Sequence, residues 1–183
     1  QIQAAIDVVE RQTIQFRHHE ELDPGLDDFT VSIWARTFGQ GDEVLVAKGG
    51  LSLEGPGWAI LNRKNDTLIR LSFGSEGLVD LSLPRIKIDQ WTHLAFVIDR
   101  AEKSAFAYVD GTIAAKASIP GSPLIAPKVD LWIGARPDGS SLFDGAVDEF
   151  AIWRRGLSEQ EVRAVAQTGL DGKRLDEGTA PAN

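Results

Sequence analysis

Aromatic side chains are the residues of this sequence that first suggest a ligand. The chain has five Trp and one Tyr. A sugar-binding site combines an aromatic ring, which covers the apolar C–H face of a pyranose, with polar groups for the hydroxyls. Trp34 alternates with apolar neighbours and is expected outside the core, and Trp58 lies where a loop enters a strand. These two residues, followed by Tyr108 beside Asp110-Gly111, are the candidate platforms.

Loops at one end of the fold could supply the polar partners. The candidate loops are 62–66, 99–103 and 136–141. The last of these, Arg136-Pro137-Asp138-Gly139-Ser140-Ser141, is the richest in hydrogen-bond donors, so Arg136 and Asp138 are candidate ligand-binding residues. The competing interpretation is a solvated turn, because Pro, Asp, Gly and Ser are ordinary turn residues.

Residues for catalysis are sparse. The chain has no Cys, only three His and no G-x-S-x-G motif. Asp148 and Glu149 are adjacent, so on a strand they are expected to point to opposite faces and not to act as a pair. His18-His19 before Glu20-Glu21 is interpreted as an exposed strand end. The sequence therefore favours a non-catalytic protein.

Composition limits the class of partner. The chain of 183 residues has 27 acidic and 19 basic side chains, a net charge of −8. Nucleic acid is a poor partner for such a chain, because phosphate binding needs clustered Lys and Arg. No apolar run is long enough for membrane insertion. The same negative charge counts against strongly anionic glycans unless calcium bridges them.

Short alternating strands separated by turn residues dominate the chain and predict an all-β fold, an antiparallel two-sheet sandwich. Asp110-Gly111 is the strongest hairpin signal, because a type I′ turn needs positive φ at both central residues. The expected strands are 13–17, 29–37, 44–48, 58–62, 67–73, 78–83, 91–99, 105–109, 112–119, 131–135 and 147–153.

One short C-terminal helix is expected to dock on the sandwich. Ser158 and Glu161 have capping-box spacing, and Gly169 is expected to end the helix. The segment after it gains Gly, Pro and charge. We therefore expect one domain over 1–169 and a tail or linker over 170–183.

Five segments in order resemble the laminin G-like jelly rolls of the concanavalin A-like lectin/glucanase superfamily. They are Asp28-Phe29-Thr30-Val31-Ser32-Ile33-Trp34-Ala35-Arg36, Trp91-Thr92-His93-Leu94-Ala95-Phe96-Val97 with Tyr108-Val109-Asp110-Gly111, Leu131-Trp132-Ile133-Gly134-Ala135, Phe143-Asp144-Gly145-Ala146-Val147-Asp148-Glu149-Phe150, and Arg155-Gly156-Leu157-Ser158-Glu159-Gln160-Glu161-Val162. Together the five segments extend the resemblance over nearly all of residues 5–168. The resemblance implies a jelly-roll sandwich and structural roles for Trp91, Trp132, Trp153 and His93.

The resemblance also bears on catalysis and metal. Glucanases of this superfamily carry an E-x-D-x-E strand motif, which this chain lacks. Many related domains hold Ca²⁺, and the matching ligands here are Asp148 and Asp7, although Val8-Val9-Glu10 replaces the usual F-D-G. No cofactor is required, and a structural Ca²⁺ is a hypothesis.

The function expected from these features is a recognition module that binds glycan. It would be part of a larger secreted protein with other domains, extracellular or periplasmic. Two alternatives stay open: a protein-protein or cell-adhesion module, and a glycan hydrolase or lyase with unrecognised catalytic residues. An apolar surface patch would favour the adhesion module, and released sugar products would reveal the enzyme.

Overall fold

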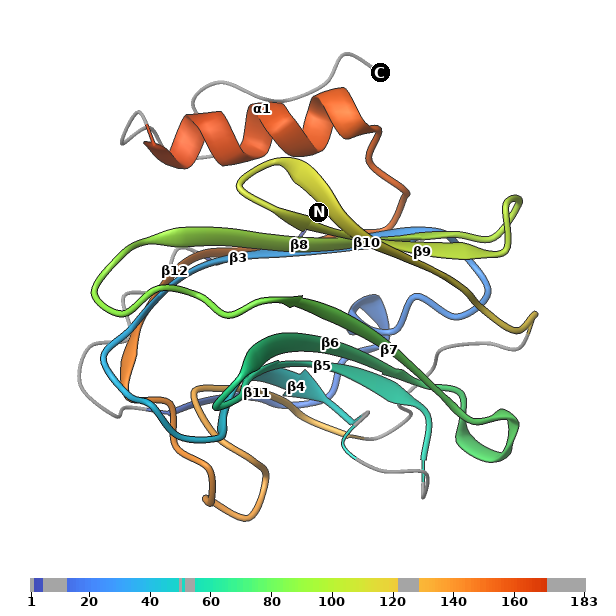
Figure 1. The fold of residues 1–183 in the computed structure, drawn as a ribbon. Helices are drawn as coiled ribbons and strands as arrows, with labels where there is room; N and C mark the ends of the chain where they lie inside the picture. The colour runs from blue at the N-terminus through green and yellow to red at the C-terminus, as the bar shows by residue number, and fades with distance from the viewer. Residues whose placement is uncertain (1, 5–12, 50, 52–54, 122–128, 171–183) are drawn as a thin grey trace.

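Two antiparallel six-stranded sheets form the layers of the fold, and a helix lies outside one of them (Figure 1). The computed structural model describes residues 2–4, 13–49, 51, 55–121 and 129–170. Sheet A has the order β1-β12-β3-β8-β9-β10, and sheet B has the order β2-β11-β4-β5-β6-β7. Each range that the alternation predicted overlaps an observed strand, and β1 is an additional strand outside those ranges. The two-sheet jelly-roll sandwich is therefore confirmed.

The strands of sheet A are β1 (Ile2–Ala4), β12 (Gly145–Trp153), β3 (Phe29–Thr37), β8 (Thr92–Asp99), β9 (Ser104–Val109) and β10 (Thr112–Ser118). Those of sheet B are β2 (Ile14–Phe16), β11 (Leu131–Ile133), β4 (Glu43–Lys48), β5 (Gly57–Asn62), β6 (Asp66–Ser72) and β7 (Leu78–Pro84). Two short 3-10 helices, η1 (Glu20–Leu22) and η2 (Gly74–Glu76), interrupt the loops. The one α-helix of the described residues is α1 (Glu159–Leu170).

The main core fills the space between the sheets. Phe29, Phe96 and Trp58 meet there edge to face, with centroids of the two Phe rings 5.5 Å apart and those of Trp58 and Phe96 5.6 Å apart. Inward residues alternate with outward ones along each strand, as the pleat requires. The core therefore takes one face of every central strand and leaves the other face of each sheet for other contacts.

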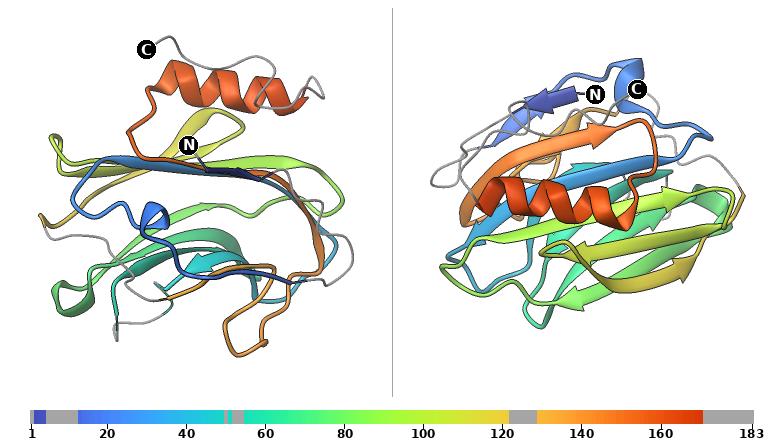
Figure 2. Two further views of the ribbon diagram at one scale, coloured as in Figure 1. Left: turned by 180° about the vertical axis from the view of Figure 1, so that it is seen from behind. Right: turned by 90° about the horizontal axis from the view of Figure 1, so that it is seen from above.

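Helix α1 covers the outer face of sheet A (Figure 2). The main-chain N–H of Glu161 donates to the Ser158 hydroxyl at 3.3 Å, and the N–H of Ser158 donates to the Glu161 carboxylate at 2.8 Å, so the capping box is confirmed. Val162 and Val165 of α1 pack on Ala95 and Trp153. The outer face of β8, apolar like its inner face, is buried under this helix.

The predicted end of the helix is corrected by one residue. Gly169 lies inside α1, which continues to Leu170. A Cβ at this position would overlap the indole of Trp34. The glycine is thus explained by a close approach of the helix to the sheet, not by a left-handed turn. No helix among the described residues is long and apolar enough to cross a membrane.

Candidate functional site

The structure buries all three candidate aromatic platforms, and Trp34, at 6% exposed, differs from the other two only in lining a cleft. Trp58 is 1% exposed in the core, because Trp58 and Ile60 face inward while Ala59 and Leu61 face outward. Tyr108 lies beneath α1, where burial raises the pKa of its phenol. Neither ring offers a free face to a sugar, so the expectation of a surface platform is corrected for both residues.

A groove crosses the outer face of sheet B, on the side of the sandwich away from α1. Its floor is apolar: Val44 of β4 pairs with Leu61 of β5, which pairs with Leu68 of β6. The groove encloses about 140 Å³. It is lined by Asp42, Glu43, Val44, Leu61, Arg63, Leu68, Arg70, Arg136 and Ser141. An apolar floor with convergent charged groups is the usual composition of a small-ligand site.

Arg136 reaches the groove from the loop between β11 and β12. The loop is a tight turn in which the Arg136 N–H donates to the Ser140 carbonyl at 2.9 Å and the Gly139 N–H donates to the Arg136 carbonyl at 2.9 Å. Ser141 has a φ of +52°, and its carbonyl accepts from the Val44 N–H at 3.0 Å. A non-glycine residue with positive φ is strained and is often found at functional sites. The turn thereby fixes both Arg136 and Ser141 over β4.

Asp138, the other candidate of this loop, does not line the groove. Its exposed carboxylate accepts hydrogen bonds from the hydroxyl and the N–H of Ser140, which lower its pKa. For Asp138 the solvated-turn interpretation is the one that the structure supports.

Two arginines of the groove are held by carboxylates. Arg63 donates to both carboxylate oxygens of Asp66, and Arg70 donates to those of Asp80 at 2.8 and 2.7 Å. These hydrogen bonds raise the pKa of both arginines. Bidentate pairing fixes the plane of each guanidinium and offsets its charge.

Arg136 differs from these two arginines. It has no salt bridge with any residue in the described part of the chain, and its Nε is buried without a hydrogen-bond partner. An unpaired buried donor costs about 1–3 kcal/mol. Arg136 is therefore the group of the groove that gains most from an acceptor on a ligand.

The two carboxylates that line the groove, Asp42 and Glu43, already accept hydrogen bonds from neighbouring loops and strands. Glu43 is 7% exposed and accepts from the Asn62 amide at 3.0 Å and from the Asp144 N–H at 3.3 Å. Asp42 accepts from the Lys64 N–H at 2.9 Å. Both carboxylates brace the loops that surround the groove.

A separate cleft lies on the outer face of sheet A. It is lined by Trp34, Trp91, Asp148, Glu149 and Gly169 and encloses about 230 Å³. Trp34 is 6% exposed and pairs across the strands with Asp148 on one side and His93 on the other. The structure thus brings Trp34 and Asp148 together and places Arg136 on the opposite sheet.

The calcium hypothesis concerns the oxygens around Asp148. Asp148 and Glu149 both line this cleft, and the described residues hold no group of three or more His, Asp or Glu side chains that could bind a metal. Calcium takes six to eight oxygens. Asp7, the other expected ligand, lies outside the described residues. Calcium at Asp148 and Asp7 stays a prediction.

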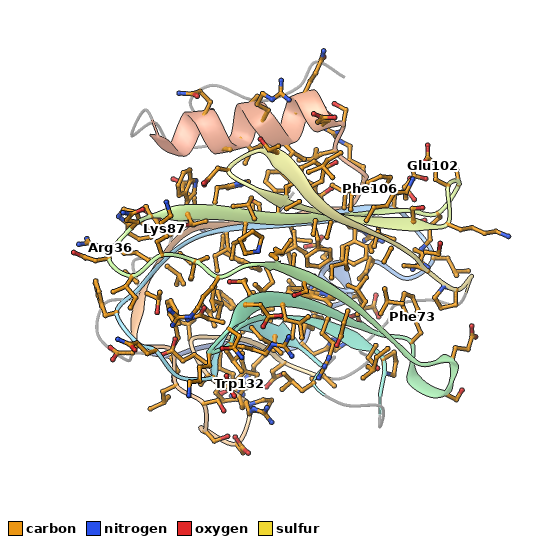
Figure 3. All side chains as sticks on the ribbon, in the orientation of Figure 1. Arg36, Phe73, Lys87, Glu102, Phe106 and Trp132 are labelled. Atoms are coloured by element: carbon orange, nitrogen blue, oxygen red, sulfur yellow. The ribbon has the colours of Figure 1, made fainter. Side chains whose placement is uncertain are left out.

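Sequence reasoning named the 62–66 loop that contains Arg63, but it missed Arg70 and Trp91 as lining residues. Arg70 lies two residues after Leu68 on β6, so the two side chains share the outer face of the strand. A search for charged residues on that face at a period of two could have found Arg70. Trp91, to which the resemblance gave a structural role, is 41% exposed, whereas Trp153 is buried against α1 as expected. Trp132 is half-buried on sheet B, where it pairs with Ala47 on the outer face (Figure 3).

Several solved structures share the fold of this chain. The chain is similar to the CBM40 of the Ruminococcus gnavus IT-sialidase bound to α2,3-sialyllactose, with 16% identity, TM-score 0.72 and coverage of 90% of this chain and 98% of that one. The binding domain of Paraclostridial mosquitocidal protein 1 has 19% identity, TM-score 0.70 and coverage of 91% and 44%. The binding domain of botulinum neurotoxin DC in complex with rat synaptotagmin II has 11% identity, TM-score 0.65 and coverage of 85% and 40%.

At these low identities the TM-scores show a shared fold and nothing more. Curated protein sequences give no match to the chain. A family model, Laminin_G_3, described as the concanavalin A-like lectin/glucanases superfamily, matches residues 10–163. The chain therefore belongs to this laminin G-like family of the concanavalin A-like superfamily.

Proposed function

We propose that this protein is a non-catalytic glycan-recognition module that binds a carboxylate-bearing sugar in the groove of sheet B. The observation that carries the proposal is Arg136, a guanidinium at the groove whose buried Nε lacks an acceptor and which has no carboxylate partner in the described residues. A planar guanidinium binds a carboxylate through two parallel hydrogen bonds. A sugar carboxylate would supply the partner that Arg136 lacks.

The rest of the groove suits the body of a sugar. Val44, Leu61 and Leu68 form the base of the groove and are 1%, 8% and 1% exposed, so the apolar surface offered to C–H groups or to an acetyl methyl is narrow and belongs mainly to Leu61. Arg63 and Arg70 are held in place by Asp66 and Asp80. The N–H groups of these arginines that remain free of the pairing can donate to sugar hydroxyls, and the aspartate oxygens can accept from those hydroxyls. Ser141 adds a hydroxyl beside Arg136. This groove uses an aliphatic floor where an aromatic platform was expected.

The net charge of −8 counts against polyanionic glycans, and the groove agrees with that expectation. The charges of Arg63 and Arg70 are offset by Asp66 and Asp80, so Arg136 is the arginine left to attract an anion. The carboxylates of Asp42 and Glu43 also line the groove and oppose the binding of a second negative charge. The groove is matched to one carboxylate and not to a row of sulfates.

The comparisons support this proposal in general terms. The sialidase module of similar fold is bound to sialyllactose, and the toxin domains of similar fold are binding domains. We extend the proposal to the setting expected from the sequence, an extracellular or periplasmic part of a larger secreted protein.

Titration calorimetry with α2,3-sialyllactose and with lactose tests the groove. The two sugars share the lactose unit and differ in the carboxylated residue, so sialyllactose should bind at least tenfold more tightly. The substitution Arg136→Gln should remove that difference, a loss of about 1.4 kcal/mol or more. Arg136→Lys should retain part of the preference for sialyllactose, because a lysine ammonium keeps the positive charge but cannot make two parallel hydrogen bonds to a carboxylate.

Arg154→Gln is the matched control. Arg154 is a half-exposed arginine outside the groove, 3.6 Å from Asp27, and its loss should leave binding unchanged. Oligogalacturonate is tested in the same way against a neutral oligosaccharide, which extends the test to uronic acids. Equal binding of the acidic and neutral member in both pairs, or full binding by Arg136→Gln, would contradict the proposal.

A protein-binding module is the second candidate, and exposed apolar side chains favour it. Phe38 and Ile88 are each 42% exposed. They are neighbours on the surface because Ile88 forms a β-bridge with Thr37, the residue before Phe38. Such a function predicts that Phe38→Ser with Ile88→Ser abolishes partner binding and leaves sugar binding intact. Incubation with mixed polysaccharides should release no products, since a hydrolase or lyase is the remaining alternative.

A further inference from the structure

The cleft on sheet A presents a tryptophan that the helix leaves uncovered. Trp91 precedes β8 by one residue and has the same parity as His93, Ala95 and Val97, which face outward. Helix α1 covers Ala95 and Val97, and near its end Gly169 packs on Trp34. Trp91 lies beyond this cover and stays 41% exposed.

Trp34 makes a rigid wall of the same cleft. Its indole is 6% exposed, is backed by the His93 ring at 5.4 Å between centroids, and is held on the other side by Gly169. The cleft of about 230 Å³ therefore has one accessible indole and one fixed indole. A rigid aromatic wall reduces the entropic cost of binding, because its side chain is already ordered before the ligand arrives.

A β-bulge brings two consecutive carboxylates into this cleft. The register of β12 against β3 shifts between Asp148 and Ala151, and Glu149 has a φ of +49°. Because of the bulge, Asp148 and Glu149 both line the cleft, so the expectation that they point to opposite faces is corrected. Bulges redirect side chains in this way and are frequent near functional sites.

The bulge is costly, which argues for a role. Glu149 combines a left-handed backbone with a carboxylate that is 9% exposed, and the Glu149 N–H donates to Asp148 Oδ1 at 2.7 Å. Strain of this kind persists where the surrounding structure over-determines it, often at ligand sites.

From this geometry we propose that the cleft is a second sugar subsite, which takes a neutral pyranose stacked on Trp91 with its hydroxyls donating to Asp148 and Glu149. Indole faces fit the C–H surface of a pyranose. Carboxylates accept hydrogen bonds from sugar hydroxyls and need not be otherwise unpaired to do so, because each has about four acceptor positions. The same carboxylates repel acidic sugars, so the subsite is opposite in charge preference to the groove with Arg136.

The two sites lie on opposite outer faces of the sandwich. Trp34 and Asp148 belong to sheet A, and Val44 and Leu61 belong to sheet B. A short oligosaccharide cannot reach both. The module would therefore bind two glycan chains at once, which gains avidity on a dense glycan surface.

NMR of the tryptophan indole N–H signals tests the subsite. The probes are methyl α-D-mannopyranoside, methyl β-D-galactopyranoside and methyl β-D-glucopyranoside at millimolar concentrations, with sodium glucuronate as the acidic comparison. At least one neutral glycoside should shift the Trp91 indole signal and the Gly169 amide signal in a saturable way, and glucuronate should shift neither. Trp91→Ala should weaken the saturation followed at Gly169 at least tenfold, and Asp148→Asn should also weaken it.

The controls separate this subsite from the groove. Trp132→Ala removes a half-exposed tryptophan on sheet B and should leave the Gly169 response intact. Arg136→Gln should remove the preference for sialyllactose over lactose and leave the Gly169 response unchanged. No shift with any of the three glycosides, or an unchanged response in folded Trp91→Ala and Asp148→Asn, would overturn the subsite whatever the outcome at the groove.

Discussion

The imidazole of His93 packs against the indole of Trp34 with 5.4 Å between ring centroids, and neither ring nitrogen of His93 has a hydrogen-bond partner among the residues that the structure describes. His93 is fully buried. Burial disfavours the imidazolium and lowers the pKa of His93 to about 4. His93, to which the resemblance gave a structural role, is thus a buried neutral ring packed on Trp34.

His93 should make stability depend on pH. Its pKa falls from 6.5 in the unfolded chain to about 4 in the fold, so the unfolded chain binds the proton first as pH drops. The free energy of unfolding should be full above pH 6.5 and decline towards pH 4, by on the order of 3 kcal/mol from this residue. Urea denaturation of the wild type and His93→Leu should give curves that converge over this range, and parallel curves would refute the assignment.

Gly169→Ala should destabilise the fold although alanine is the better helix former. The added methyl would overlap the Trp34 indole, and such overpacking costs about 1–3 kcal/mol. Gly41→Ala is the matched control, because nothing lies within 4 Å of a Cβ there. Thermal unfolding should show a lower midpoint for Gly169→Ala than for Gly41→Ala.

Thr30→Val should loosen the entry to α1. The buried Thr30 hydroxyl donates to the Arg155 carbonyl at 3.0 Å and accepts from the Leu157 N–H at 2.9 Å. Valine leaves both groups unpaired, at a cost of about 1–3 kcal/mol. Hydrogen exchange of α1 amides should accelerate in Thr30→Val and stay unchanged in Thr112→Val, where the side chain is exposed.

Glu161→Gln should weaken the helix start in a pH-dependent way. Hydrogen bonds from the Arg155 guanidinium lower the pKa of Glu161 to about 2. Its charge therefore stabilises the fold above pH 4.5, and this effect disappears as pH falls towards 2. The variant should lose about 1 kcal/mol or less at pH 7 and nothing at pH 2. A loss that is equal at both pH values would contradict this account, and Glu159→Gln serves as control for the exposed Glu159–Arg163 pair.

Local rules predicted most of the fold. Asp110 and Gly111 have φ values of +49° and +76°, as a type I′ hairpin requires, and the capping box forms as its spacing indicated. Both features depend on a few neighbouring residues, so the sequence specifies them directly.

The sites were harder to predict because they depend on which strand faces are covered. β5 is apolar on both faces, so alternation alone could not decide whether Trp58 points inward. The bulge at Glu149 places Glu149 on the same face of β12 as Asp148, where regular alternation would place it on the opposite face. No Gly, Asn or Pro at this position indicates the bulge in the sequence. Arg136 was a candidate from its loop, but its lack of a carboxylate partner emerged only from the packing.

The positions of β1 and α1 bear on how binding assays should be built. β1 begins at Ile2 on one edge of sheet A, and α1 ends at Leu170, one residue after Gly169 of the cleft (Figure 1). β1 pairs directly with β12, which carries Asp148 and Glu149 of the cleft. Both ends of the described chain therefore lie in the layer that carries the cleft. A label introduced at Ile2 or Leu170 would be on the opposite layer from the groove, where it leaves ligand access to Arg136 unchanged.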